Sequence, residues 1–139
     1  MEAIMVKKRG FTLLELLIVI GLIGILISIA AVSYSSAQKR SRDARRMQDV
    51  KAVSDAMEQY YADSGGTYPT SEVLLTTDNK YLPAGMPKDP KTSLDYTIAY
   101  DADGVDYCAC ATLEGTNGNA TNTSCTFGTG PFYCVKNLQ

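Results

Sequence analysis

The chain has 139 residues, of which 45% are hydrophobic, and its formal net charge at pH 7 is −2. It contains four cysteines and no histidine. Without histidine, the commonest general base and every catalytic triad that uses it are excluded, so the composition does not indicate an enzyme.

The first predicted element is an apolar segment, residues 11–32, in which Glu15 is the only charged residue. A helix of this length reaches about 33 Å at ~1.5 Å per residue, enough to span a bilayer. A secretory signal peptide cut near Ala31-Val32-Ser33 is one alternative, although its apolar core is usually only ~7–15 residues long. An ordinary single-pass anchor is another. Neither alternative explains Glu15, because a carboxylate in lipid costs up to a few kcal/mol and usually marks a function.

The residues at the start of this segment, "KKRGFTLLELL" (7–17), combine a short basic leader with Gly, an aromatic residue, Thr, Leu and Glu. This pattern resembles the prepilin family of type IV pilins and type II secretion pseudopilins. The resemblance implies that a membrane aspartyl peptidase, the prepilin peptidase, cuts after Gly10 and that the new amino terminus of Phe11 is methylated. A glycine suits such a cut, because it lets the backbone unwind into a protease cleft.

A cut after Gly10 also gives Glu15 a partner. The carboxylate then lies near the positive end of the helix dipole and near the α-ammonium of Phe11. The amine of the same chain is about 6 Å away along the axis, so a neighbouring subunit shifted by one step supplies an equally close one. The resemblance implies the second arrangement, in which Glu15 is an assembly residue that sets the register between subunits.

The helix is expected to continue beyond the membrane to about Ala62. Apolar residues recur at spacings of three and four, which indicates one buried face; they are Ala44, Met47, Val50, Val53, Met57 and Tyr60. Residues 39–51 carry six basic and two acidic side chains, whereas residues 52–139 carry four basic and eleven acidic. A solvated helix face next to anionic headgroups or an acidic neighbour is favoured over a nucleic-acid-binding arm.

Gly65, Gly66 and Pro69 end the predicted helix, and an alternating pair of segments, 94–100 and 105–113, predicts a β-hairpin around "DADG". The expected fold is α+β, with the long helix packed under a small antiparallel sheet and a disulfide-tied C-terminal loop. The expected regions are a leader (1–10), a transmembrane or filament-core helix (11–33), an amphipathic helix (34–62) and a globular β head (63–139).

The four cysteines, Cys108, Cys110, Cys125 and Cys134, are expected to form two disulfides in an oxidising compartment. Zinc is disfavoured, because the first pair is C-x-C and no histidine can help. Cys108 and Cys110 point to one face of a strand and should not pair with each other. The nested pairing of 108 with 134 and 110 with 125 is favoured over the crossed alternative, and either would tie down the loop 115–130.

Asp101, Asp103 and Asp106 gather in the predicted hairpin turn. Their oxygens suit a hard cation, and the resemblance to major pseudopilins implies a calcium site in the head. The competing interpretation is that Asp-Gly simply forms the turn, and this interpretation is favoured. No other cofactor is expected.

Together these patterns predict a structural subunit of a type IV pilus-like filament, a helical homo-oligomer. Its expected partners are the prepilin peptidase, the inner-membrane assembly platform and the membrane, and no nucleic acid. The subunit would cross the cytoplasmic membrane once with its amino end inside, and then enter an extracytoplasmic filament. The alternatives are a major pseudopilin of a type II secretion system and a membrane-anchored extracytoplasmic binding protein.

Overall fold

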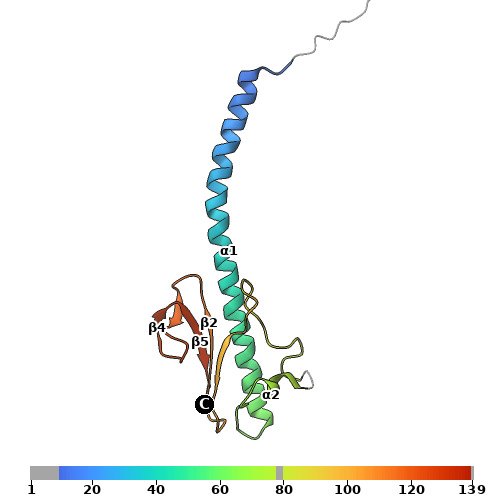
Figure 1. Cartoon of the computed structure of the whole chain (residues 1–139), viewed down its shortest axis with the longest axis vertical. Coiled ribbons are helices and arrows are strands. Elements are labelled where there is room, and N and C mark those ends of the chain that lie inside the picture. Colours follow the sequence, from blue (N-terminus) through green and yellow to red (C-terminus); the bar gives the residue numbers. More distant parts are fainter. Residues whose placement is uncertain (1–9, 78–79, 139) are drawn as a thin grey trace, which may run out of the picture. The chain divides into compact units, whose positions relative to one another are not determined.

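The computed structural model describes residues 10–77 and 80–138 of the chain, which divides into two compact units, residues 1–37 and 38–139. The predicted leader, residues 1–10, lies outside the described residues except for Gly10. The elements (Figure 1) are α1 (Leu13–Asp63), α2 (Val73–Thr76), β1 (Thr97–Tyr100), β2 (Tyr107–Thr112), β3 (Gly118–Ala120), β4 (Phe127–Gly130) and β5 (Phe132–Lys136). The α+β class expected from the sequence is confirmed.

Helix α1 is continuous because no proline occurs before Pro69. It ends at Asp63 and is followed by two glycines with positive φ, 82° at Gly65 and 98° at Gly66. The amide of Gly66 donates a hydrogen bond to the carbonyl oxygen of Tyr61 at 3.0 Å, which satisfies one of the last free carbonyls of the helix. The predicted end at about residue 62 is therefore confirmed.

The head contains a five-stranded antiparallel sheet in the order β1-β2-β5-β3-β4. The predicted hairpin is its first pair, with Thr97 opposite Cys110 and Tyr100 opposite Tyr107. Strands β3 and β4 were not expected, because glycine and small polar residues dominate residues 115–130. The close approach of the strands requires some of these glycines: a Cβ at Gly118 would overlap the carbonyl oxygen of Phe132.

The main core lies between α1 and one face of the sheet. Its fully buried helix residues are Val50, Val53 and Met57, and Tyr107 and Ala109 face them from β2. Segments after the helix complete the core with Tyr68, Leu75 and Leu82. The predicted stripe is correct in its centre and wrong at its start, because Ala44 is exposed and Arg46 takes the buried position four residues before Val50.

Three hydroxyls in this core are hydrogen-bonded, those of Tyr68, Tyr107 and Ser54, whereas the buried hydroxyl of Tyr100 at its edge has no partner among the described residues. The carboxylate of Glu58 accepts hydrogen bonds from the hydroxyls of Tyr68, at 3.0 Å, and Tyr107, at 3.1 Å. The Tyr107 hydroxyl also lies 2.8 Å from that of Ser54. Burial, with Glu58 nearby, raises the pKa of Tyr68 to about 12, so this hydroxyl keeps its proton and remains a donor at neutral pH.

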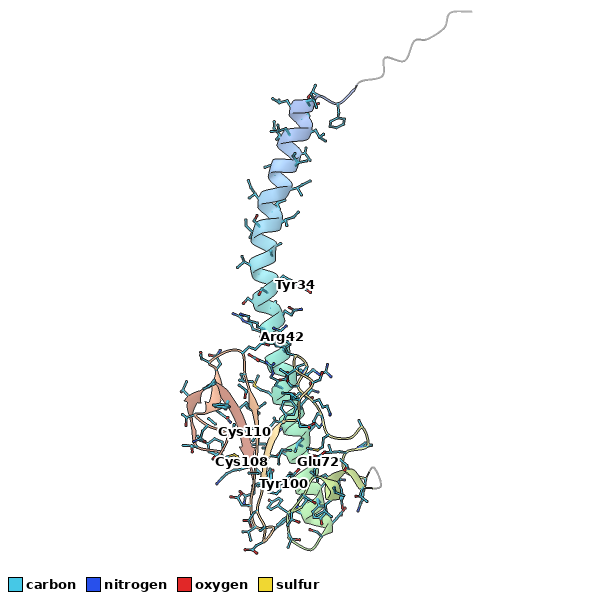
Figure 2. All side chains as sticks on the ribbon, in the orientation of Figure 1. Tyr34, Arg42, Glu72, Tyr100, Cys108 and Cys110 are labelled. Atoms are coloured by element: carbon cyan, nitrogen blue, oxygen red, sulfur yellow. A yellow bond between two sulfur atoms is a disulfide. The ribbon has the colours of Figure 1, made fainter. Side chains whose placement is uncertain are left out.

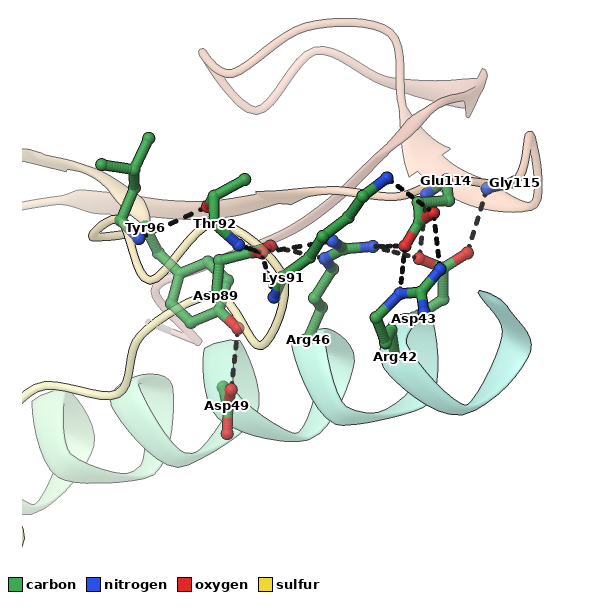
Figure 3. Close-up of polar contacts among 11 residues, drawn as sticks. Arg42, Asp43, Arg46, Asp49, Asp89, Lys91, Thr92, Tyr96, Glu114 and Gly115 are labelled. Atoms are coloured by element: carbon green, nitrogen blue, oxygen red, sulfur yellow. Dashed lines mark hydrogen bonds and ion pairs between the residues drawn. The ribbon is translucent and has the colours of Figure 1, made fainter. Parts of the chain in front are cut away.

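A cluster of six charged residues joins three parts of the head (Figure 3). Its centre is Arg46, which is only 3% exposed and whose guanidinium contacts Asp43 at 2.7 Å, Asp89 at 2.6 Å and Glu114 at 3.1 Å. The Arg46 cluster consists of Arg42, Asp43, Arg46, Asp89, Lys91 and Glu114. Through it, α1 holds the proline-rich loop before β1 and the turn after β2.

Replacing Arg46 by methionine keeps an apolar stem but removes the cation that three carboxylates share. We expect Arg46→Met to lower the free energy of unfolding of the head by about 2–3 kcal/mol, less than for a fully buried pair because the carboxylates keep 13–15% exposure. Urea denaturation of the chain in detergent micelles, followed by tyrosine near-ultraviolet circular dichroism, measures this. Arg45→Met, on the exposed face of α1, is the control and should change stability by less than ~0.5 kcal/mol; equal losses would contradict the assignment.

The same cluster should make the head sensitive to acid. Hydrogen bonds from Arg46 hold the pKa of Asp89 well below its ordinary range, and those from Arg42 do the same for Glu114. Because the folded-state pKa values are depressed, their stabilisation is fully present above the unfolded carboxyl pKa of about 4 and is lost as the pH falls below it. The urea midpoint should therefore fall between about pH 6 and about pH 3, and less steeply in Arg46→Met; a parallel fall in both proteins would argue against this cause.

Candidate functional site

The first helical turn contains the residues that the sequence singled out for processing and assembly. Gly10 and Phe11 precede the helix and are exposed, Phe11 by 86%. Glu15 lies in the first turn of α1. The predicted cut, between Gly10 and Phe11, therefore lies in exposed, non-helical backbone, and cleavage there stays a prediction.

Thr12 and Glu15 cap the start of α1 reciprocally. The amide and the hydroxyl of Thr12 donate to Oε2 of Glu15 at 2.9 and 2.8 Å, and the amide of Glu15 donates to the hydroxyl of Thr12 at 3.2 Å. This is a capping box, and its sequence signal is the spacing T-x-x-E in "TLLE". This capping role was not predicted from the sequence, and it gives Glu15 an intrachain partner besides any amine.

The capping arrangement leaves Glu15 free to take a further partner. Both bonds from Thr12 use Oε2, and no described residue donates a hydrogen bond to Oε1. The first backbone amides of a helix also lie here, so the surroundings favour negative charge. A carboxylate in this position is able to cap its own helix and accept a bond from a second group at the same time.

The first part of α1 is apolar around its whole circumference. It is long and apolar enough to cross a membrane, and its most apolar stretch has no buried residue. Figure 2 shows its side chains projecting on all sides of the helix. The two hydroxyls of Ser28 and Ser33 donate to the helix's own carbonyl oxygens at Gly24 and Ile29, at 2.8 and 3.3 Å. Apart from the capping box, this segment thus presents an apolar surface suited to lipid or to other helices.

The basic segment after the apolar stretch is less free than its sequence suggests. Arg42 contacts Glu114 at 2.6 Å, and Arg46 is buried. Lys39, Arg40 and Arg45 remain exposed. Two of the six basic residues of 39–51 therefore stabilise the head, and the interpretation of the segment as a uniformly solvated face is wrong for Arg42 and Arg46.

The disulfides differ from the favoured prediction. The structure pairs Cys108 with Cys125 and Cys110 with Cys134, which is the crossed alternative, so the nested pairing is wrong. The reason is the strand register: β5 places Cys134 opposite Cys110, and Lys136 opposite Cys108. Cys125 instead comes from the turn between β3 and β4. The expectations that all four cysteines form disulfides, and that Cys108 and Cys110 do not pair with each other, agree with the structure.

The disulfides lie on the face of β2 opposite the main core. Tyr107 and Ala109 point into that core, and Cys108 and Cys110, which alternate with them, form a second small cluster on the other face. Cys110 and Cys134 are each 1% exposed, whereas Cys108 and Cys125 are half-buried. Both cysteines of β2 are labelled in Figure 2. The two disulfides join the β3–β4 turn and strand β5 to strand β2.

The three aspartates of the proposed calcium site lie in the β1–β2 turn and serve its backbone. Oδ2 of Asp101 accepts hydrogen bonds from the amides of Asp103 and Val105, at 3.3 and 3.1 Å. Oδ1 of Asp106 accepts one from the amide of Tyr107 at 2.7 Å. These contacts are those of a hairpin turn, and calcium binding stays a prediction.

Comparison with known proteins places this N-terminal arrangement in a family. Residues 5–31 match the family described as "Prokaryotic N-terminal methylation motif". The chain is 30% identical over 97 residues to the fimbrial protein EcpB of Eikenella corrodens, covering 68% of this chain and 61% of that protein. It is 29% identical over 97 residues to the type II secretion system core protein G of Vibrio cholerae, covering 60% of this chain and 66% of the relative.

A third relative, the type IV major pilin protein PilA of Myxococcus xanthus, is 37% identical over 57 residues, which are 41% of this chain and 26% of PilA. The matched region covers only about half to three fifths of the fimbrial relatives, 51% of EcpC and 61% of EcpB. No solved structure matches the chain. The methylation motif at the start of an apolar helix, together with pilin and secretion protein G relatives, shows that the chain belongs to the family of type IV pilins and type II secretion pseudopilins.

Proposed function

We propose that the protein is a structural subunit of a type IV pilus-like filament, processed after Gly10 and assembled through α1. The observation that carries this proposal is the single carboxylate, Glu15, at the capped start of a helix that is otherwise apolar on all sides. A filament core made of such helices buries their apolar surfaces against one another. It also brings amino termini close to carboxylates.

The pairing of Glu15 supplies a mechanism for ordered assembly. In lipid, an ionised carboxylate costs up to a few kcal/mol, and an ammonium within ~4 Å offsets much of that cost. Cleavage before Phe11 creates an α-ammonium, and Oε1 of Glu15 is available to accept it. When the amine belongs to the neighbouring subunit, insertion is favoured in one axial register only.

The proposed topology follows from the same segment. The leader and the amino end lie in the cytoplasm, where the prepilin peptidase and the assembly platform act, and the head with its disulfides lies outside. We infer a structural and not a catalytic role, because no histidine is present and the relatives are named as fimbrial, pilin and secretion-system core proteins.

A major pseudopilin of a type II secretion system is the second candidate, favoured by similarity to proteins named core protein G in several bacteria. It shares the whole amino-terminal chemistry of the first. A membrane-anchored binding protein is the third candidate, and it explains the length of the apolar segment but gives no reason for the charge at Glu15. Filament length and retraction in the source cell separate the first two candidates.

Processing is tested by the intact mass of the protein in the membrane fraction. We expect the mature chain to begin at Phe11 and to carry one methyl group. Gly10→Leu should leave uncut precursor, because a bulky side chain replaces the flexible residue at the cut, whereas Met5→Leu, farther from the cut, should be processed normally. A mature chain beginning at Tyr34 would instead establish a secretory signal peptide.

Two variants separate the charge of Glu15 from its capping role. Glu15→Gln keeps an acceptor for the amide of Thr12 but loses the negative charge. Thr12→Val loses the hydroxyl of the capping box but keeps the carboxylate. We expect Glu15→Gln to enter the membrane normally and to reduce the amount of sheared filament by more than about tenfold. A tenfold change in the equilibrium constant for adding one subunit corresponds to a free-energy loss of only ~1.4 kcal/mol.

Thr12→Val should assemble at close to the wild-type level. Electron microscopy and immunoblotting of sheared fractions measure both variants against their membrane pools. The reverse pattern, with filaments from Glu15→Gln and none from Thr12→Val, would show that helix capping and not the ion pair limits assembly.

A further inference from the structure

The four cysteine sulfurs form a single compact cluster. All four Sγ atoms lie within 4.8 Å of one another, and those of Cys108 and Cys110, which belong to different disulfides, are 3.5 Å apart. They come from β2, the β3–β4 turn and β5. The C-x-C spacing that argued against zinc in the sequence is therefore only half of the arrangement, because strand pairing and a turn bring the other two sulfurs to the same place.

Besides the covalent disulfides, hydrogen bonds hold the backbone around this cluster in place. Cys110 and Cys134 face each other in the β2–β5 ladder. The side chain of Asn119 donates to the carbonyl oxygen of Cys134 at 2.9 Å and accepts from its amide at 2.7 Å. In the β3–β4 turn, Oδ1 of Asn122 accepts hydrogen bonds from the amides of Ser124 and Thr126, the two neighbours of Cys125. Reduction of both disulfides would leave the four thiols gathered.

The spacing of the sulfurs suits a tetrahedral metal ion. At a zinc–sulfur distance of about 2.3 Å, the sulfurs of a tetrahedral site are about 3.8 Å apart. From the present positions, the bonded sulfurs must separate to about 3.8 Å, and the most distant sulfurs, now within 4.8 Å of one another, must close by about an ångström.

The surroundings are also compatible with four soft ligands. Two of the cysteines, Cys110 and Cys134, are buried, and residues 115–135 include no Asp, Glu, Lys or Arg. Lys136 lies opposite Cys108 in the ladder and offers a positive charge beside a site that would carry a net −2. Hard oxygen-seeking cations would find no carboxylate in that stretch, whereas thiolates select zinc-like metals.

We propose that the reduced chain binds one zinc-class divalent cation through the thiolates of Cys108, Cys110, Cys125 and Cys134. Two molecules of a dithiol reductant convert the two disulfides to four thiols and are themselves oxidised to cyclic disulfides. The cation then displaces four thiol protons and forms four metal–sulfur bonds. Disulfide and metal forms are mutually exclusive, and both fasten the same turn and strand to β2.

Proton release makes the binding dependent on pH. Three of the sulfurs lie near backbone carbonyl oxygens: Cys108 is 3.6 Å from Thr123, Cys125 is 3.4 Å from Val135, and Cys134 is 3.4 Å from Asn122. These carbonyls accept hydrogen bonds from neutral thiols and so stabilise the reduced, metal-free chain. The metal must compete with protons, and its apparent affinity should rise with pH.

The test uses the full chain in detergent micelles, reduced with a dithiol, freed of reductant under nitrogen and titrated with Co²⁺. We expect the intense visible absorption of tetrahedral cobalt thiolate, saturating at one Co²⁺ per chain, weakening towards acidic pH and lost on addition of Zn²⁺. The oxidised chain should show no such absorption. A reduced chain that shows none, whether or not tyrosine near-ultraviolet circular dichroism finds its head folded, would overturn the proposal.

Ligand variants sharpen the result. Cys134→Ser and Cys125→Ser should each lower the affinity for Co²⁺ by more than about tenfold, at least the loss that follows removal of a supporting group at a metal site. Ser124→Ala, in the same turn but not a ligand, should bind like the wild type. Equal binding by all four proteins would assign the metal to another part of the chain and refute the four-thiolate site.

Discussion

Helix α1 has an apolar first part suited to lipid and a second part that packs in the core of the head, and the rest of the structure depends on this division. Helix α1 satisfies its own backbone hydrogen bonds, which is the condition for entering lipid. Along its first part the side chains are apolar on every side, and the hydroxyls of Ser28 and Ser33 bond back to the helix. From Gln38 onward only one face is apolar, and that face is buried by the head. The change of pattern along an unbroken helix allows one element to serve as both anchor and core.

In the proposed filament, the amino end of the apolar segment carries the specificity that the segment itself lacks. Apolar helices pack with little preference for one register over another, since lipid tails are as apolar as leucine. Glu15 supplies a point charge at one end, where free backbone amides and the capping hydroxyl of Thr12 stabilise it. Under the proposed pairing, a group that is costly without a partner is satisfied only when neighbouring subunits are in the correct register.

In the head, ion pairs and disulfides hold together segments that bury little apolar surface. Arg46 joins α1 to the loop before β1 and to the turn after β2. On the face of the sheet away from α1, the two disulfides attach the β3–β4 turn, which is made of small polar residues, and β5 to β2. Both devices fasten segments with too few apolar side chains to pack by themselves, and the entropy cost of ordering such segments explains why they are needed.

The parts of the fold that local patterns determine were predictable from the sequence. The glycine pair after α1 and the alternation around the β1–β2 turn fixed the end of the helix and the hairpin. The position of Glu15 was found because a lone charge in an apolar run is conspicuous, although its capping by Thr12 was overlooked. Strands β3 and β4 were missed because their glycines are explained only by close strand approach, as at Gly118.

The disulfide pairing and the burial of Arg46 could not be read from spacing, because both depend on tertiary register. Cys134 pairs with Cys110 because β5 aligns them. Arg46 occupies a core position of the helical repeat, and its carboxylate partners at Asp89 and Glu114 are 43 and 68 residues away in sequence.

The central claim is that the carboxylate of Glu15 binds the amino terminus of a neighbouring subunit. Filaments assembled from equal amounts of two chains, one with ¹⁵N at Phe11 and the other with ¹³C at the Glu15 carboxylate, allow solid-state NMR to detect only contacts between subunits. The account predicts a dipolar coupling that corresponds to a separation of about 4–5 Å or less, as for an ion pair. Coupling that appears only when both labels are in the same chain would contradict it.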